Sequence, residues 1–126
     1  KSFFAKIKTA LIVEDNPLNM NLIKIMLKKL EIECIDAITG EEALRLAEKS
    51  DADFLLVDIN LGHGISGITF MEKIRDQKKY SDTPIIAVTA YSFRELQEYF
   101  SKEGFTDYIG KPFKYEELER MLHKNS

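Results

Sequence analysis

The sequence has little of several features that would point to particular classes of protein. Its single cysteine, Cys34, leaves no partner for a disulfide within the chain and excludes a cysteine metal cluster, which favours a reducing compartment. No apolar run approaches the roughly 20 residues that a membrane-spanning helix needs. The formal net charge is −3, so the chain lacks the basic footprint typical of nucleic-acid binding. We therefore expect a cytoplasmic protein that neither inserts into a membrane nor binds nucleic acid directly.

The length and composition are those of a single globular domain. Of the 126 residues, 44% are hydrophobic and 31% are charged, which is enough to build a sizeable core. No repeat, linker or low-complexity stretch divides the chain. We expect one domain over residues 8–123. The basic, aromatic opening is too short for a signal peptide, so residues 1–7 are predicted to be an N-terminal extension or a linker.

Short apolar runs alternate with helical patterns, which is typical of strand–helix–strand units in a parallel sheet. Runs such as FLLV are apolar throughout, as a strand buried on both faces requires. These runs predict strands at residues 9–13, 34–38, 54–58, 84–89 and 107–109. Right-handed crossovers with helices on both faces then favour an α/β fold, with a doubly wound five-stranded parallel sheet of order 2-1-3-4-5 and five helices.

Helix signals fill the intervals between the predicted strands. Asn16 is a suitable N-cap, and Pro17 suits the first helical position. The apolar face of this first helix is predicted from residues that recur at helical spacing, namely Leu18, Leu22, Ile25, Met26 and Leu30. Further helices are predicted at residues 41–49, from Gly67 onward, at 93–102 and at 115–123, the last with Leu118 and Leu122 facing inward.

Acidic residues stand at the ends of two of the predicted strands. Glu14 and Asp15 follow the first strand, and Asp58 ends the third. In the predicted strand order these two strands are neighbours, and their carboxyl ends open into one crevice. Three carboxylates there repel one another unless a cation neutralises them, and an all-oxygen site suits Mg²⁺ or Mn²⁺. The arrangement suits the handling of a phosphoryl group, with Asp58 as its acceptor.

Two further strand ends carry groups that fit this chemistry. Thr89 ends the fourth strand, where its hydroxyl can donate a hydrogen bond to a phosphoryl oxygen. Lys111 follows the fifth strand and can form an ion pair with Asp58 or with a phosphate on it. Pro112 comes next, and we expect a tight turn in which the peptide bond between Lys111 and Pro112 can be cis.

Together these motifs resemble the receiver domain of two-component response regulators. The resemblance extends from Lys8 to His123, and it rests on VEDN, FLLVD, Thr-Ala and Lys-Pro-Phe at the ends of strands one, three, four and five. The stretch VEDNPLN is similar to receivers attached to hybrid sensor histidine kinases in particular. The resemblance implies the flavodoxin-like receiver fold and a phosphoacceptor domain, which supports only its own phosphorylation and dephosphorylation and is not otherwise an enzyme.

The resemblance also implies a role for each residue of the acidic site. Asp58 would be the phosphoacceptor. Asp15 and Asp58 would bind Mg²⁺ directly, together with the backbone carbonyl of Asn60. Glu14 would hold the ion through water. The donor would be a histidine kinase or a histidine phosphotransfer protein, which are the partners of the family.

A conformational switch is implied by three more positions. Thr89 would hydrogen-bond the phosphoryl group, Lys111 would pair with it, and Tyr108 matches the aromatic switch residue of the family. Phosphorylation would then change the surface of the fourth helix, the fifth strand and the fifth helix. An output domain or a second copy of the chain is the expected partner of that surface.

The loop after Asp58 departs from the family pattern. Receivers usually carry Met-Pro there, whereas this chain has Leu61-Gly62, and its loop is one residue longer before Ser66-Gly67. Gly62 and Gly64 make the loop more flexible than a proline would. We expect metal binding to be unaffected, because Asn60 stays in register with Asp58, and we expect the loop shape and its partner contacts to differ.

Two other classes of protein share parts of this pattern. An aspartyl-phosphate hydrolase of small phosphate esters also uses an aspartate nucleophile and Mg²⁺, but it commonly needs an acid two residues later, where this chain has Asn60. A flavin-binding flavodoxin-like module would need a Ser/Thr/Gly-rich phosphate loop after strand one, and EDNPLN would repel a phosphate. Turnover of a generic phosphate ester and an absorption spectrum separate these alternatives.

Overall fold

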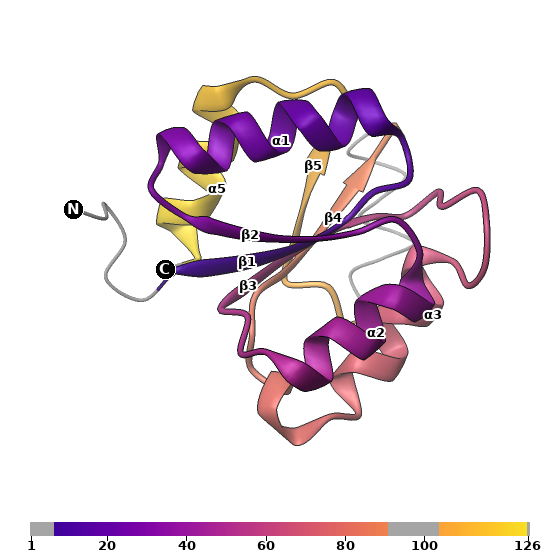
Figure 1. The fold of residues 1–126 in the computed structure, drawn as a ribbon. Coiled ribbons are helices and arrows are strands. Elements are labelled where there is room, and N and C mark those ends of the chain that lie inside the picture. The colour runs from indigo at the N-terminus through magenta and orange to yellow at the C-terminus, as the bar shows by residue number, and fades with distance from the viewer. Residues whose placement is uncertain (1–6, 91–103, 126) are drawn as a thin grey trace.

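The computed structural model describes residues 7–90 and 104–125, which form a parallel sheet with helices on both faces (Figure 1). The strands are β1 (Thr9–Val13), β2 (Glu33–Ala37), β3 (Phe54–Asp58), β4 (Ile85–Thr89) and β5 (Asp107–Gly110). Their order is β2-β1-β3-β4-β5, and every neighbouring pair is parallel. The predicted α/β fold and strand order are confirmed, although β2 begins and ends one residue earlier than predicted.

The helices within the described residues flank this sheet in two pairs. They are α1 (Pro17–Lys29), α2 (Gly40–Lys49), α3 (Gly67–Arg75) and α5 (Tyr115–Lys124), with a short 3-10 helix η1 (Lys78–Tyr80) after α3. In Figure 1, α1 and α5 lie on one face of the sheet, and α2 and α3 lie on the other. The start of α1 is as predicted, with Asn16 as the N-cap. The helix predicted at residues 93–102 lies outside the described residues.

The central strand β3 separates two hydrophobic cores. All five of its residues are buried, and successive side chains point to opposite faces. Phe54 and Leu56 join the core beneath α1 and α5, where Leu118 and Leu122 are inward as predicted. Leu55 and Val57 join the core beneath α2 and α3. Burial on both faces fixes β3 firmly, so Asp58 at its carboxyl end has a well-defined position.

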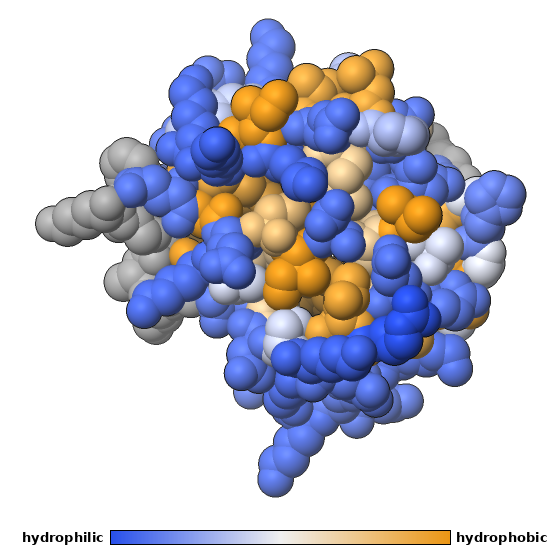
Figure 2. Space-filling model, in the orientation of Figure 1, coloured by the Kyte–Doolittle hydropathy of each residue, from blue (hydrophilic) through white to orange (hydrophobic). Residues whose placement is uncertain are grey.

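The buried face of α1 matches the predicted one only in part: Leu30, just after the helix, is buried, and Met26 packs against the core. The fully buried side chains of α1 are Met20, Ile23 and Leu27. Three of the predicted core residues are instead exposed, with 69% of Leu18, 47% of Leu22 and 64% of Ile25 accessible to solvent. Figure 2 shows hydrophobic groups gathered over this helix. Two sets of apolar residues recur at helical spacing in α1, and the periodicity alone did not identify the set that packs on the sheet.

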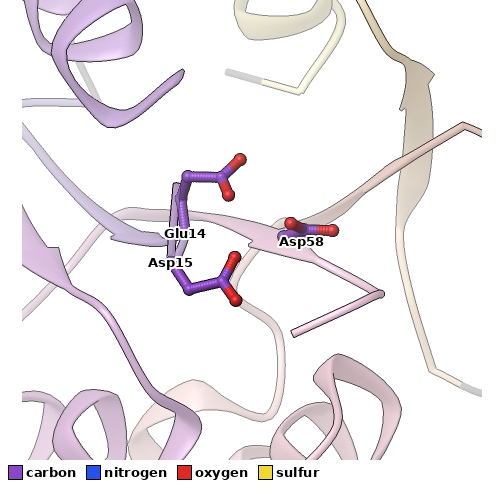
Figure 3. A group of neighbouring side chains, drawn as sticks. All are labelled: Glu14, Asp15 and Asp58. Carbon is purple, nitrogen blue, oxygen red and sulfur yellow. The ribbon is translucent and has the colours of Figure 1, made fainter. Parts of the chain in front are cut away.

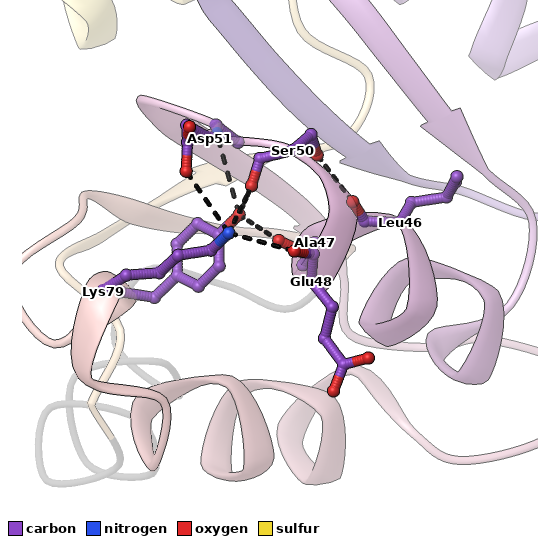
Figure 4. Close-up of polar contacts among 8 residues, drawn as sticks. Leu46, Ala47, Glu48, Ser50, Asp51 and Lys79 are labelled. Atoms are coloured by element: carbon purple, nitrogen blue, oxygen red, sulfur yellow. Dashed lines mark hydrogen bonds and ion pairs between the residues drawn. The ribbon is translucent and has the colours of Figure 1, made fainter.

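Polar side chains tie helices and loops together at the amino ends of the central strands (Figure 4). Tyr80 is buried, and its hydroxyl oxygen lies 2.6 Å from the carbonyl oxygen of Ala47 and 2.9 Å from that of Ser50. The ammonium of Lys79 donates to the carbonyl oxygens of Ser50, at 2.6 Å, and Glu48, at 3.2 Å. The stretch RDQKKYSD is mostly polar and charged and has no apolar periodicity, so the 3-10 helix and the anchoring role of Tyr80 were not predicted.

Arg75, at the end of α3, joins the loops that precede β4 and β5. Its Nη1 donates to the carbonyl oxygens of Tyr80 and Thr83, both at 2.7 Å. Its Nε donates to the carbonyl oxygen of Gly104 at 3.0 Å, and its Nη2 to the Thr106 hydroxyl at 3.1 Å. A guanidinium group suits this position because its donors are held in a rigid, planar fork.

Candidate functional site

The carboxyl ends of β1 and β3 bring the three predicted acidic residues together (Figure 3). Val13 of β1 pairs in register with Val57 of β3, so the residue after each of them lies at the same edge of the sheet. One carboxylate oxygen from each of Glu14, Asp15 and Asp58 lies within 4.8 Å of the others. Residues far apart in the sequence therefore form one oxygen cluster, as the topology predicted.

Two of these carboxylates are almost completely removed from solvent. Glu14 is 2% exposed and Asp58 is 3% exposed, while Asp15 is half-buried. Burial raises the pKa of Glu14, and the nearby charge of Asp58 raises it further, although the Asn16 N–H that Glu14 accepts acts in the opposite direction. A cation would relieve both the burial cost and the repulsion, so the cluster is suited to binding a metal ion.

Lys111 supplies a positive charge to this cluster. Its Nζ lies 2.9 Å from Oδ2 of Asp58 and 3.2 Å from Oε1 of Glu14. Burial on its own would lower the pKa of Lys111, but the interactions with Asp58 and Glu14 outweigh it, so the pKa is raised. The peptide bond between Lys111 and Pro112 is cis, as the sequence allowed. The predicted pair of Lys111 and Asp58 is present, and the contact with Glu14 is additional.

The Asp58 side chain is held through both of its oxygens. Oδ2 accepts a hydrogen bond from Lys111, and Oδ1 accepts the backbone N–H of Asn60 at 2.9 Å. The Asn60 bond keeps the first residues of the following loop folded back over the end of β3. The orientation of the carboxylate is thereby fixed from two sides.

Thr89 and Tyr108 lie at the adjacent strands. Thr89 ends β4 and is fully buried, and its carbonyl oxygen accepts the N–H of Lys111 at 2.7 Å. Tyr108 is half-buried in β5 and packs against Ile59 and Ala87. Thr89 therefore lies on the strand between β3 and β5, Tyr108 lies on β5 itself, and their switch roles stay predictions.

Two contacts beside the acidic cluster were not foreseen from the sequence. The N–H of Gly62 donates to Oδ2 of Asp15 at 2.7 Å, and the N–H of Ile65 donates to the carboxylate of Glu41. The only signal in the sequence was the departure of this loop from the Met-Pro pattern. The contacts depend on where the loop crosses α2, which residue spacing does not reveal.

Comparison with known proteins identifies the family. The model of the response regulator receiver domain matches residues 10–123. The polar-differentiation response regulator DivK of Brucella ovis is 36% identical over 105 residues, which are 83% of this chain and 85% of that protein. The chain therefore belongs to the response regulator receiver domain family, as its motifs predicted.

Solved structures agree with this assignment. The receiver domain of sensor histidine kinase PA1611 from Pseudomonas aeruginosa PAO1, determined with a magnesium ion in its active site cleft, has a TM-score of 0.85 and 35% identity, and the match covers 94% of this chain and 97% of that one. The Vibrio cholerae chemotaxis protein CheY4 has a TM-score of 0.89 and 28% identity, with 95% and 99% covered. A similar receiver domain thus binds magnesium in its cleft. Among residues 7–90 and 104–125, no helix is long and apolar enough to cross a membrane.

Proposed function

We propose that this domain, residues 8–123 with residues 1–7 as an extension, is a phosphorylation-dependent switch in a two-component phosphorelay. Asp58 accepts a phosphoryl group from a phosphohistidine. The observation that carries the proposal is the buried Asp58 carboxylate, held 2.9 Å from the Lys111 ammonium at the acidic edge of the sheet. A carboxylate oxygen of Asp58 forms the new P–O bond while the P–N bond to the donor imidazole breaks. Lys111 stays beside the transferred group and offsets its negative charge.

The acidic cluster is the proposed site for Mg²⁺, and Mn²⁺ has similar ligand preferences. Asp15 and Asp58 would hold the ion with the backbone carbonyl of Asn60, and Glu14 would act through water. The donor set fits, because three carboxylates offer oxygens within 4.8 Å of one another and two of them are buried. When bound, the ion neutralises negative charge on the carboxylates and on the phosphoryl oxygens.

The switch is proposed to begin at Thr89, which would hydrogen-bond the phosphoryl group. Thr89 would move inward, and Tyr108, which packs against the cluster of Ile59 and Ala87, would fill the space that Thr89 vacates. The affected surface comprises β5, α5 and the helix predicted at residues 93–102. An output domain or a second copy of the chain is the proposed reader of this surface.

The proposed phosphodonor is a histidine kinase or a histidine phosphotransfer protein, and the site has an apolar approach that such a protein can use. A groove of about 290 Å³ runs from Glu14 and Lys111 to Leu22 and Met26 of α1. Lys111 lines this groove and forms the ion pair with Asp58, so a donor that covers the groove would lie beside the acceptor. The likeness to the receiver domain of a sensor histidine kinase supports a place in a hybrid kinase.

Phosphorylation with acetyl phosphate and Mg²⁺ tests the proposal. Intact-mass spectrometry should find one added phosphate on the wild type, labile at alkaline pH, and none on Asp58→Asn. Asp51→Asn is the matched control, because the Asp51 side chain is 93% exposed at the opposite edge of the sheet. Labelling of Asp58→Asn equal to that of the wild type would refute the assignment of the acceptor.

A second measurement separates an acceptor from a hydrolase. Asn60 occupies the position where an aspartyl-phosphate hydrolase needs an acid, and an amide cannot transfer protons at neutral pH. We expect no steady-state release of phosphate or alcohol from a generic phosphate ester. Continuous turnover that Asp58→Asn abolishes would favour the hydrolase.

A further inference from the structure

The loop at residues 61–66 donates a hydrogen bond to a proposed metal ligand. The Gly62 N–H lies 2.7 Å from Oδ2 of Asp15, across 47 positions of sequence. An N–H group that binds one oxygen of a carboxylate limits its rotation and so directs the other oxygen. Hydrogen bonds of this kind to ligating carboxylates commonly tune metal affinity.

Glycine suits position 62 because it has an N–H and no side chain to displace the Asp15 carboxylate. The proline that receivers usually carry here has no N–H to donate. A Cβ at this position would lie 2.9 Å from Oδ2 of Asp15, closer than side-chain carbons normally approach an oxygen. The chain therefore has a donor to Asp15 that the common pattern lacks, and its backbone comes close enough to use that donor.

A second carboxylate outside the acidic cluster holds the same loop. Glu41, in the first turn of α2, accepts the Ile65 N–H through both oxygens, at 3.3 Å for Oε1 and 3.1 Å for Oε2. Gly64, with a φ of 74°, lies directly against this carboxylate, which leaves no room for a side chain there. The Ile65 side chain packs against Gly40, at the start of α2. Glu41 thus fixes the loop three residues beyond Gly62.

We propose that Glu41 is a positioning residue for the metal site: by binding the Ile65 N–H it holds the loop so that the Gly62 N–H orients Asp15. This inference rests on the proposed function, because it assumes that Asp15 binds Mg²⁺. Glu41 itself does not touch the metal. The glycine-rich loop is therefore held in place at both ends. The Asn60 N–H donates to Asp58 before the loop, and the Ile65 N–H donates to Glu41 near its end.

Mg²⁺ titrations of the intact chain by isothermal calorimetry test the proposal. Glu41→Ala should weaken Mg²⁺ binding by roughly 3- to 10-fold, and Gly62→Pro by about 10-fold, the lower end of effects on outer-shell partners. Glu41→Gln keeps an acceptor oxygen and should recover most of the affinity. Glu48→Gln is the matched control, because Glu48 lies on the same helix with its carboxylate directed away from the drawn contacts (Figure 4), and it should bind Mg²⁺ as the wild type does.

The double variant Glu41→Ala/Gly62→Pro distinguishes positioning from general support of the fold. If Glu41 acts through the Gly62 N–H, Glu41→Ala should cause no further loss of affinity once that N–H is gone. Fully additive losses would overturn the proposal, and so would wild-type affinity in Glu41→Ala.

Hydrogen exchange of the Gly62 amide provides a measurement that needs no folded Gly62→Pro variant. This amide should exchange slowly in the wild type and at least several-fold faster in Glu41→Ala, and equal rates would overturn the proposal. Failure of the wild type to bind Mg²⁺ at all would instead overturn the proposed metal site, so the two failures are distinguishable.

Discussion

The two edges of the sheet use charged side chains in opposite ways. At the carboxyl edge, Glu14, Asp15 and Asp58 lie within 4.8 Å of one another, and Lys111 forms ion pairs with two of them. At the amino edge, the cation Arg75 donates to backbone carbonyl oxygens and a hydroxyl. One edge concentrates like charges, and the other uses charge to join neighbouring loops.

This difference separates function from stability along a single sheet. Buried like charges raise the free energy of the folded protein until a cation arrives, so the carboxyl edge is expected to contribute affinity at a cost in stability. At the amino edge, Arg75, Lys79 and Tyr80 donate to carbonyl oxygens, so these contacts stabilise the fold without bringing like charges together. Substitutions at the amino edge should therefore lower stability and leave metal affinity unchanged, whereas removal of a carboxylate at the carboxyl edge should weaken metal binding without lowering stability.

The largest expected effect is on metal affinity at the carboxyl edge. Asp15→Asn should weaken Mg²⁺ binding by about 100-fold or more, because removal of a direct ligand exceeds the loss of an outer-shell contact. Its free energy of unfolding without metal should not fall, since one of three clustered charges is removed. Calorimetric titration and urea unfolding measure the two quantities.

Asp53→Asn is the control for that result at the amino edge. Oδ2 of Asp53 accepts the N–H groups of Lys8 and Thr9, at 3.0 Å and 3.1 Å. This variant should keep its Mg²⁺ affinity and lose about 1 kcal/mol of stability. A loss of affinity in Asp53→Asn equal to that in Asp15→Asn would contradict the separation of the two edges.

The next largest effect is expected on stability, from removal of the Arg75 guanidinium group. Arg75→Ala should lower the free energy of unfolding by about 1.5–3 kcal/mol, because the carbonyl oxygens of Tyr80, Thr83 and Gly104 lose a charged donor. Mg²⁺ affinity of the folded protein should not change. Arg45→Ala, at an exposed position of α2, should unfold within about 0.5 kcal/mol of the wild type.

Tyr80→Phe should have a smaller effect of the same kind. The variant keeps the buried ring but removes the hydroxyl that contacts the carbonyl oxygens of Ala47 and Ser50, at a cost of about 1 kcal/mol. Urea unfolding measures this cost. Tyr115→Phe removes a hydroxyl from a ring that stacks beneath Lys29 and should unfold like the wild type. Equal stability of all three proteins would show that Tyr80 does not anchor α2.

The smallest expected effect is an increase in the free energy of unfolding in Glu14→Gln, and it depends on pH. The pKa of Glu14 is raised above its ordinary value of 4.5, so the folded state favours the protonated form. Protonated Glu14 therefore stabilises the folded state relative to ionised Glu14. This stabilisation is complete below pH 4.5 and is lost as the pH rises through the raised pKa of the folded state. Without Mg²⁺, Glu14→Gln should therefore match the wild type at low pH and exceed it by about 0.5 kcal/mol at pH 7. Urea unfolding of both proteins from below pH 4.5 to pH 7 measures the difference. A wild type that is more stable than Glu14→Gln at pH 7 would contradict the prediction.

The strands and the acidic cluster were predictable because few alternatives existed. The run FLLVD is apolar for the whole length of a strand and ends in one aspartate, and parallel topology then brings that residue to the end of β1. The pair of Lys111 and Asp58 followed from the same geometry. Their proposed roles in phosphorylation rest on the family and on the experiments above.

Other features could not be predicted because they depend on packing between distant elements. The helix α1 has apolar residues on two sides, and contact with the sheet selects Met20 and Ile23 over Leu18 and Leu22. The contact between Glu41 and Ile65 depends on the path of a glycine-rich loop, for which sequence spacing gives no rule. Tyr80 lies in a charged stretch whose periodicity indicates neither burial nor a helix.

The exposure of Leu18, Leu22 and Ile25 has a consequence for the choice of phosphodonor under the proposed function. Between 47% and 69% of each remains accessible in the folded chain, so exchanging them should change folding stability by only about 0.5 kcal/mol. They also lie outside the acidic cluster. Substitutions at positions that contribute neither to folding nor to the acidic cluster should leave the proposed switch intact. Under the proposed function, substitutions on the outer side of α1 are expected to change the choice of phosphodonor and to leave the chemistry at Asp58 unchanged.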